Sequence, residues 1–67
     1  MIIIKVNGQE WKVDDGTSIS DLLSRFKISP KVCALEKNGE IINRDDFGCT
    51  LLKSNDQIEI IRMMGGG

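Results

Sequence analysis

The hydrophobic residues near the start of the chain recur with a period of two, which is the pattern of β-strands: Ile2, Ile4 and Val6 share one face, and Trp11 and Val13 share another. Two such runs, residues 2–6 and 10–13, flank the dipeptide Asn7-Gly8. Asn-Gly is a strong hairpin signal because both residues tolerate the positive φ angles that a tight two-residue turn requires. We therefore expect the chain to open with a β-hairpin, in which Trp11 packs in the core or on a half-exposed strand.

After this hairpin the apolar period lengthens to that of an α-helix. The positions that form one stripe, at spacings of three and four residues, are Ile19, Leu22, Leu23 and Phe26. Thr17 or Ser18 can cap the start of the helix, where Asp21 would interact favourably with the positive end of the helix dipole. Pro30 is expected to end the helix, because proline disfavours helical angles in the residue before it. The sequence thus predicts one amphipathic helix that needs a sheet to cover its apolar side.

Three further strands are predicted in the second half of the chain. They are residues 32–37, a short strand after the second turn Asn38-Gly39, and residues 58–63. The intervening residues 43–57 lack periodicity and are predicted to be mostly loop. The candidate apolar anchors of this loop are Phe47, Leu51 and Leu52.

This order of elements predicts an α+β fold of the β-grasp type, with a mixed sheet of four to five strands and one helix packed on one face. The right-handed crossover rule allows the last strand to pair in parallel with the first, which would place it in the centre of the sheet. A split βαβ fold is the alternative, but it needs a second helix that residues 43–57 do not supply. We expect one β-grasp domain over residues 1–62, followed by a flexible glycine tail over residues 63–67.

Composition excludes several classes of protein. A chain of 67 residues with 40% hydrophobic residues makes one small globular domain. Nine basic against ten acidic residues give a formal net charge of −1, without the basic stripe that nucleic-acid binding requires. The apolar start, MIIIKV, is too short for a signal peptide or a membrane span. We therefore expect a cytoplasmic protein that binds neither nucleic acid nor membrane, and that is a monomer when alone.

The chain also lacks the residue types of common catalytic sites. It has no histidine, which removes the commonest general base and the commonest metal ligand. Two separated cysteines do not build a zinc site by themselves, and no glycine-rich phosphate-binding motif is present. We therefore predict no catalytic residue, no metal site and no enzyme. Cys33 lies in a predicted strand and is expected to be a buried, reduced apolar residue, whereas the exposure of Cys49, in a loop, stays open.

The last five residues, MMGGG, close with three glycines. Glycine loses more backbone freedom on ordering than any other residue, so three in a row disfavour a packed end. An extended residue spans at most ~3.3–3.6 Å, so five residues could reach roughly 16–18 Å beyond the domain. The pattern leads to the hypothesis that the terminal carboxylate is itself the working part of the molecule.

Four segments, in their order and spacing, resemble the ThiS family of thiamine-biosynthesis sulfur carriers, which belongs to the ubiquitin-like β-grasp superfamily. They are VNGQ in the first hairpin, DDGTSISDLL leading into the helix, EKNGEIINR around the second turn, and SNDQIEIIRMMGGG at the end. Arg44 matches an arginine position of that family. The chain departs from its relatives at Asn43, where many have proline, and at Asn55, where glycine is usual. It also departs at Met63-Met64, where aromatic or β-branched residues are usual.

The resemblance implies that a partner enzyme adenylates the carboxylate of Gly67, which a sulfur donor then converts to a thiocarboxylate for thiazole synthesis. Gly65 and Gly66 would thread the tail into the nucleotide site of that enzyme, because they have no Cβ. Candidate docking residues beside the tail are Arg62, Met63 and Met64.

The implied partners are an adenylating enzyme of the ubiquitin-activating type, a sulfur donor such as a cysteine desulfurase, and a thiazole synthase. ATP and magnesium would be used by the activating enzyme, and no cofactor would be bound by this chain. Within the same superfamily, a molybdopterin-type sulfur carrier and a ubiquitin-like protein modifier remain open. An alternative of another class is a non-covalent β-grasp interaction domain, for which the tail would have no role.

Overall fold

A computed structural model describes residues 1–62 of the chain, so the predicted tail at 63–67 lies outside the described residues. The elements are β1 (Ile2–Val6), β2 (Gln9–Val13), α1 (Ile19–Arg25), β3 (Cys33–Lys37), β4 (Glu40–Ile41) and β5 (Gln57–Arg62). Short 3₁₀ turns cover Pro30–Val32 and Arg44–Asp46. The predicted strands and helix are all present, with bounds that differ by a residue or two.

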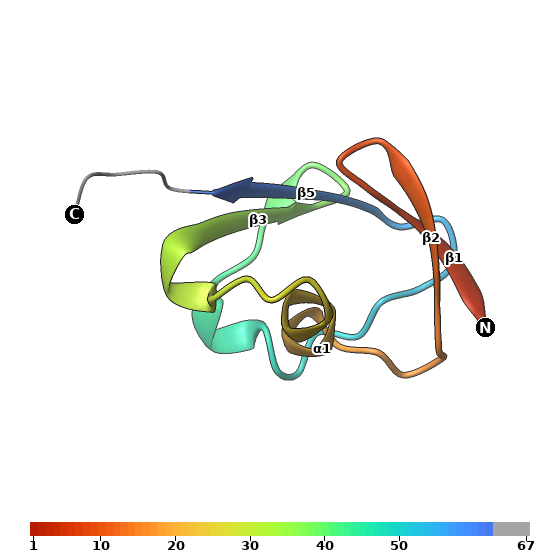
Figure 1. The fold of residues 1–67 in the computed structure, drawn as a ribbon, viewed down its shortest axis with the longest axis horizontal. Helices are drawn as coiled ribbons and strands as arrows, with labels where there is room; N and C mark the ends of the chain where they lie inside the picture. Colours follow the sequence, from red (N-terminus) through yellow and green to blue (C-terminus); the bar gives the residue numbers. More distant parts are fainter. Residues whose placement is uncertain (63–67) are drawn as a thin grey trace.

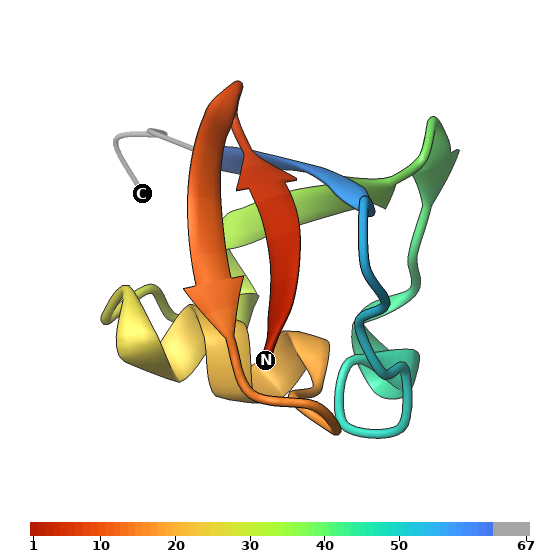
Figure 2. The same cartoon turned by 90° about the vertical axis from the view of Figure 1, so that its right-hand side faces the viewer.

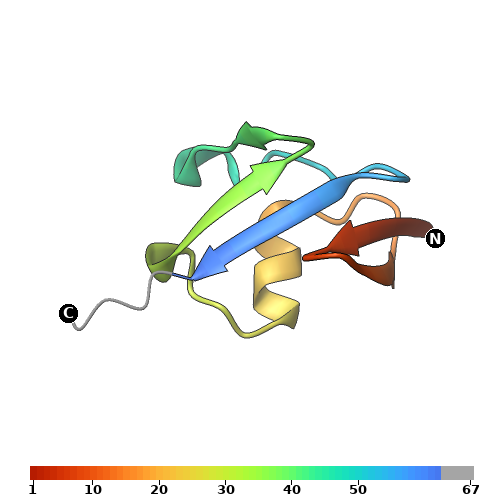
Figure 3. The same cartoon turned by 90° about the horizontal axis from the view of Figure 1, so that it is seen from above.

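The strands form one five-stranded mixed sheet in the order β2-β1-β5-β3-β4. β5 lies in the centre, parallel to β1 and antiparallel to β3 (Figure 3). The helix α1 packs beneath one face of this sheet (Figure 1). These observations confirm the predicted β-grasp arrangement. The split βαβ alternative is wrong, because residues 43–57 contain only one 3₁₀ turn and no second α-helix.

Both Asn-Gly pairs form the tight turns that the sequence predicts. Asn7 and Gly8 have φ angles of 50° and 84°, and Asn38 and Gly39 have φ angles of 54° and 86°. Positive φ at both central residues is the signature of the type I′ turn, whose twist matches that of the two strands it joins. The two hairpins therefore follow from these dipeptides.

The start of α1 is closed by a capping box. The backbone N–H of Asp21 donates to Ser18 Oγ at 3.1 Å, and the backbone N–H of Ser18 donates to Asp21 Oδ2 at 3.2 Å. These two bonds satisfy donors that a helix start leaves free. Of the two predicted caps, the structure selects Ser18, while the Thr17 hydroxyl donates to the carbonyl of Asp14.

The prediction that Pro30 ends the helix is wrong. The helix ends at Arg25, and Lys27 follows with a left-handed φ of 58°. The backbone N–H groups of Lys27 and Ile28 donate to the carbonyls of Ser24 and Leu23, at 3.0 and 2.9 Å. This is a Schellman motif, in which glycine is the usual left-handed residue. Because lysine occupies this position here, the sequence does not show the usual signal for the C-terminal end of the helix. Pro30 instead begins the 3₁₀ turn before β3.

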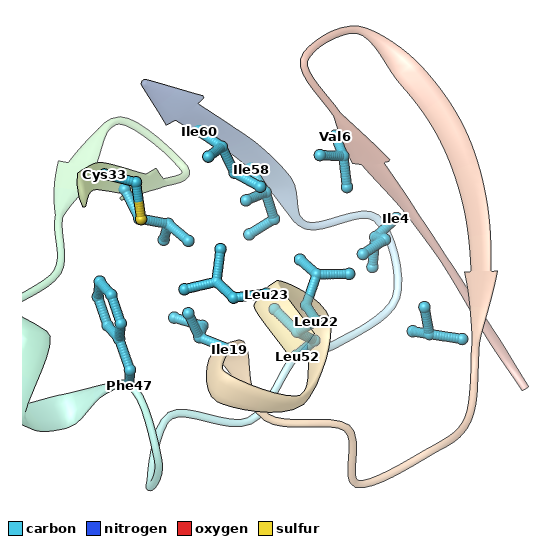
Figure 4. Packing of buried hydrophobic residues seen from close by; sticks show 12 residues of the cluster. Ile4, Val6, Ile19, Leu22, Leu23, Cys33, Phe47, Leu52, Ile58 and Ile60 are labelled. Atoms are coloured by element: carbon cyan, nitrogen blue, oxygen red, sulfur yellow. The ribbon is translucent and has the colours of Figure 1, made fainter. Parts of the chain in front are cut away.

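The core lies between the sheet and α1 (Figure 4). Its buried members are Ile4, Val6, Val13, Ile19, Leu22, Leu23, Cys33, Leu35, Phe47, Leu52, Ile58 and Ile60. Seen from the end, the helix and the long loop after β4 lie together beneath the sheet (Figure 2). The core thus joins every main element except the short β4.

Two of the three predicted loop anchors are confirmed. Phe47 and Leu52 are buried, but Leu51 is 52% exposed. The loop runs extended here, because Leu51 forms a bridge with Ser18 and the N–H of Leu52 donates to the carbonyl of Thr17 at 2.9 Å. Successive side chains of an extended segment point to opposite sides, so only one of the two leucines can enter the core.

Candidate functional site

The end of β5 is the part of the described chain that leads into the predicted tail. Ile58 and Ile60 point into the core, whereas Ile61 and Arg62 are exposed. The exposed Arg62 is accessible, as its predicted docking role requires. The other predicted site residues, Met63, Met64, Gly65, Gly66 and Gly67, lie outside the described residues.

The two edges of β5 have different neighbours. On one edge the pairs with β3 continue as far as Cys33 opposite Arg62. On the other edge the parallel pairs with β1 stop at Val6 opposite Ile58, because β1 turns away at Asn7. The last part of the strand therefore has a strand partner on one edge only.

The side chain of Asn7 occupies the edge that β1 leaves. Its Oδ1 accepts a hydrogen bond from the backbone N–H of Ile60 at 2.7 Å, and its Nδ2 donates to the Ile60 carbonyl at 3.2 Å. The backbone N–H of Asn7 also donates to the carbonyl of Ile58 at 2.8 Å. The sequence marked Asn7 only as a turn residue, so this contact with β5 was missed.

Asn38 of the second turn makes a comparable set of contacts at the start of β5. Its Oδ1 accepts from the N–H of Gln57 at 2.9 Å, and its backbone N–H donates to the Gln57 carbonyl at 2.8 Å. Its Nδ2 donates to Asp56 Oδ1 at 3.0 Å. The two Asn-Gly turns thus attach their asparagine side chains near opposite ends of the central strand.

Asp56 is a buried carboxylate, only 6% exposed, directly before β5. Besides the amide of Asn38, it accepts a hydrogen bond at Oδ2 from the backbone N–H of Lys53 at 2.8 Å. The ammonium group of Lys37 lies 4.0 Å from the same oxygen. The preceding Asn55 has a left-handed φ of 72°, which fits the expectation that relatives carry glycine there.

A groove of about 320 Å³ opens beside the last part of β5. Its lining residues are Val6, Asn7, Gln9, Trp11, Phe26, Ile28, Ile60 and Arg62. The rings of Trp11 and Phe26 have centroids 4.9 Å apart at a tilt of 59°, and the Arg25 guanidinium lies 5.7 Å from the Trp11 centroid. Trp11 is partly buried against the core, as the sequence predicts.

The two cysteines differ in solvent exposure. Both are free, with Cys33 buried and Cys49 exposed. Burial raises the pKa of the Cys33 thiol above its ordinary value, and the positive charges of Arg44 and Arg62 oppose this shift only in part. Because the thiolate is the reactive form of cysteine, Cys33 is the inert apolar residue that was predicted.

Alkylation tests this difference directly. Iodoacetamide should modify Cys49 in the native protein and leave Cys33 intact, because only the thiol of Cys49 is exposed. In denaturant both should react, which peptide mass spectrometry can confirm. Equal modification of both residues in the native protein would contradict the burial of Cys33.

Arg44, the position matched to an arginine of the ThiS family, is exposed, and its side chain binds a backbone carbonyl. Its Nε donates to the carbonyl of Pro30 at 2.9 Å, so it joins the two 3₁₀ turns next to the start of β3. Within residues 1–62 there is no group of three or more His, Cys, Asp or Glu side chains that could hold a metal ion. No helix in this described part is long and apolar enough to cross a membrane.

In residues 1–62, the mixed sheet, the single α-helix and the central position of β5 define a β-grasp protein of the ubiquitin-like class. Comparison with known proteins narrows this class. The model of the ThiS family matches residues 3–67, and the chain belongs to this family. Family membership confirms the prediction of a β-grasp protein of the ThiS type. It also confirms the prediction of a sulfur carrier of thiamine biosynthesis rather than an enzyme.

Individual relatives agree with the family assignment. The chain is 37% identical to the sulfur carrier protein ThiS of Bacillus subtilis over 67 residues, which cover 97% of this chain and 100% of the relative. The crystal structure of the thiamine biosynthesis protein (ThiS) from Geobacter metallireducens aligns with a TM-score of 0.82 at 33% identity, covering 98% of this chain and 100% of that one.

A third relative is much longer than this chain. It is a thiazole synthase of Magnetococcus marinus, 33% identical over 64 residues. The match covers 96% of this chain but only 20% of the relative. A segment similar to this chain therefore occurs within a larger polypeptide that is named for thiazole synthesis.

Proposed function

We propose that this chain carries sulfur as a thiocarboxylate at Gly67 and delivers it for synthesis of the thiazole ring of thiamine. The observation that carries the proposal is the match of the ThiS family model, which continues through the glycine segment to residue 67. The full-length match to the Bacillus subtilis sulfur carrier supports it. Arg62 ends the central strand of the sheet, so the segment that follows continues from the strand that lies between β1 and β3.

The chemistry needs no side chain of the carrier. An oxygen of the Gly67 carboxylate attacks the α-phosphate of ATP, which forms an acyl-adenylate and releases pyrophosphate. A sulfide sulfur then attacks the acyl carbon and expels AMP, which leaves a thiocarboxylate. If the donor is a persulfide, its outer sulfur attacks and forms an acyl disulfide, and a second thiol of the donor then cleaves the S–S bond to release the thiocarboxylate and a disulfide. Placement of Mg-ATP and neutralisation of its charge belong to the activating enzyme. To the bond-forming steps themselves the carrier contributes its terminal carboxylate, which has to reach the nucleotide.

In this proposal the glycines provide access and the residues before them provide docking. Gly65 and Gly66 carry no Cβ and can pass through a narrow channel, and five extended residues reach roughly 16–18 Å. Arg62, Met63 and Met64 would contact the partner outside that channel. Methionine suits this role because its flexible thioether chain adapts to irregular surfaces.

We place the carrier in the cytoplasm. The partners proposed for it are an adenylating enzyme of the ubiquitin-activating type, a cysteine desulfurase or similar sulfur donor, and a thiazole synthase. The Magnetococcus marinus relative supports the last of these, because a carrier-like segment is there part of a thiazole synthase polypeptide. Joining two modules in one chain raises their effective concentration for each other, which is useful where they act together.

Intact mass tests the proposed function. The chain is incubated with ATP, a candidate activating enzyme and a sulfur source, and we expect a mass gain that matches one oxygen replaced by sulfur. Fragmentation should place the change on the peptide that ends in Gly67. A variant with one residue added after Gly67 serves as the control and should stay unmodified.

Other outcomes point to the alternatives. A ladder of isopeptide-linked products would favour a ubiquitin-like modifier, and transfer of the sulfur to a molybdopterin precursor would favour the molybdopterin-type carrier. If the terminus stays unmodified with every activating enzyme of this class, a non-covalent interaction domain becomes the better explanation.

A further inference from the structure

The last part of β5 needs support on the edge that faces away from β3. The parallel pairs with β1 end at Val6 opposite Ile58, two residues before the last buried anchor, Ile60. A strand end that is paired on one edge only opens more easily than one paired on both. What holds Ile60 on its second edge therefore determines how firmly the strand end is oriented.

Asn7 continues the β1 edge by means of its side chain. A carboxamide offers a carbonyl acceptor and an N–H donor, as a peptide group does. Asn7 uses both on the same residue, accepting from the Ile60 N–H at 2.7 Å and donating to the Ile60 carbonyl at 3.2 Å. The Asn7 backbone N–H also donates to the Ile58 carbonyl. These three hydrogen bonds extend the parallel pairing of β1 with β5 by one step beyond the end of β1.

The turn itself does not require this side chain. Asp and Gly also suit a residue with positive φ in a type I′ turn, and Asn7 has a φ of 50°. Glycine makes neither bond to Ile60, and a carboxylate can accept from the N–H but cannot donate to the carbonyl. Of these three residues, only asparagine can make both bonds to Ile60.

We propose that Asn7 is a positioning residue that fixes the direction of the β5 end and so presents the C-terminal segment to the activating enzyme. The proposal rests on the proposed function, because it assigns Asn7 a part in activation of the terminus. Ile60 lies two residues before the end of the strand at Arg62. Orienting that end in the free carrier removes an ordering cost that the complex with the enzyme would otherwise bear.

Asn38 provides a matched control within the same chain. It occupies the same position of the same turn type, with a φ of 54°, and its side chain also makes two hydrogen bonds. These bonds hold Asp56 and Gln57 at the start of β5, far along the strand from Arg62. Asn7→Gly and Asn38→Gly therefore remove similar bonds from opposite ends of one strand and keep a residue suited to each turn.

The experiment compares these two variants and Asn7→Asp by amide hydrogen exchange, thermal unfolding and adenylation kinetics. In N7G the amide of Ile60 should exchange faster, and kcat/KM for adenylation should fall about five- to tenfold. In N38G the amide of Gln57 should exchange faster, whereas kcat/KM should stay at the wild-type value. N7D keeps the acceptor for the Ile60 N–H, so it should recover part of the lost rate and also serves if N7G folds poorly.

Two results would overturn the proposal. One is a fall in kcat/KM that follows the loss of Tm equally in N7G and N38G, since Asn7 would then contribute only to stability. The other is fast exchange at Ile60 in N7G with an unchanged rate of adenylation. Failure of the wild-type chain to be adenylated by any activating enzyme would instead remove the proposed function, and the presentation role with it. Exchange at Ile60, which needs no enzyme, separates that case from a failure of Asn7 to hold the strand.

Discussion

A Gly67→Ala variant should fold as the wild type and be adenylated about 100-fold more slowly, since a misplacement of ~1 Å at a reacting atom can reduce a rate on the order of 10²-fold. The added Cβ would stand next to the carboxylate that has to approach the α-phosphate of ATP. The core residues that the structure describes, from Ile4 to Ile60, are all unchanged in this variant. We expect the rate loss to appear in pyrophosphate release at saturating carrier, with an unchanged thermal unfolding curve.

Gly48→Ala is the matched control for this prediction. Gly48 is exposed and its φ is not positive, and a Cβ built there would meet only the hydroxyl of Ser20, at 3.8 Å. This is an ordinary van der Waals contact, so the variant should fold and be activated at the wild-type rate. If Gly67→Ala also turned over normally, steric access to the nucleotide would not explain why glycine stands at the terminus.

The regular elements could be predicted because their signals are local. Both residues of each Asn-Gly dipeptide readily adopt the left-handed φ angles that their turn requires. Ser18 lies only three residues from Asp21, with which it forms the capping box. The alternation of Ile58 and Ile60 with Gln57 and Glu59 indicates the buried face of β5 without knowledge of its partners. Given these pieces, topology rules leave few arrangements other than a β-grasp fold.

The two errors come from positions where the local signal pointed elsewhere. Lys27 adopts the left-handed angle that usually attracts glycine, so no glycine marks the end of the helix, and the prediction relies on Pro30 as the stop instead. Leu51 and Leu52 are equally apolar, and only the pairing of this segment with Ser18 decides which of the two is buried. Propensity alone does not contain such information.

The contacts that hold β5 could not be predicted, because they join distant parts of the chain. Asn7 and Ile60 are 53 residues apart, and Asn38 is 18 residues from Asp56. A single sequence shows an asparagine in a turn and an aspartate in a loop, which are the usual places for both residues. The glycine segment is the opposite case, because it was predicted from the sequence and lies outside the described residues.

Loss of the Asp56 carboxylate should have the largest effect on stability among the polar residues in β5 and directly before it. Asp56→Ala should lower the free energy of unfolding by about 3 kcal/mol, since hydrogen bonds to charged groups contribute roughly 1.5–3 kcal/mol each. The substitution leaves the backbone N–H of Lys53 and the amide of Asn38 without their acceptor. Lys37 adds little to this sum, because it lies 4.0 Å from the carboxylate and remains partly exposed.

Such a loss is large for a domain of this size. Proteins gain roughly 0.05–0.15 kcal/mol of stability per residue, which corresponds to about 3–10 kcal/mol for this chain. Urea unfolding should therefore show a much lower midpoint at an unchanged m value, because the surface exposed on unfolding stays nearly the same. Asp45→Ala is the control, since Asp45 is exposed and should change the stability by less than about 0.5 kcal/mol.

Asp56→Asn separates the charge of this group from its shape. The amide keeps one oxygen acceptor and places a donor where the second oxygen was, so it cannot accept from both Lys53 and Asn38. We expect the free energy of unfolding of Asp56→Asn to lie between that of the wild type and that of Asp56→Ala. Equal losses for Asp56→Ala and Asp45→Ala would contradict the role assigned to the buried carboxylate. The start of β5 would then be held by the pairing of Asn38 with Gln57 and by the core contact of Ile58, without a contribution from charge.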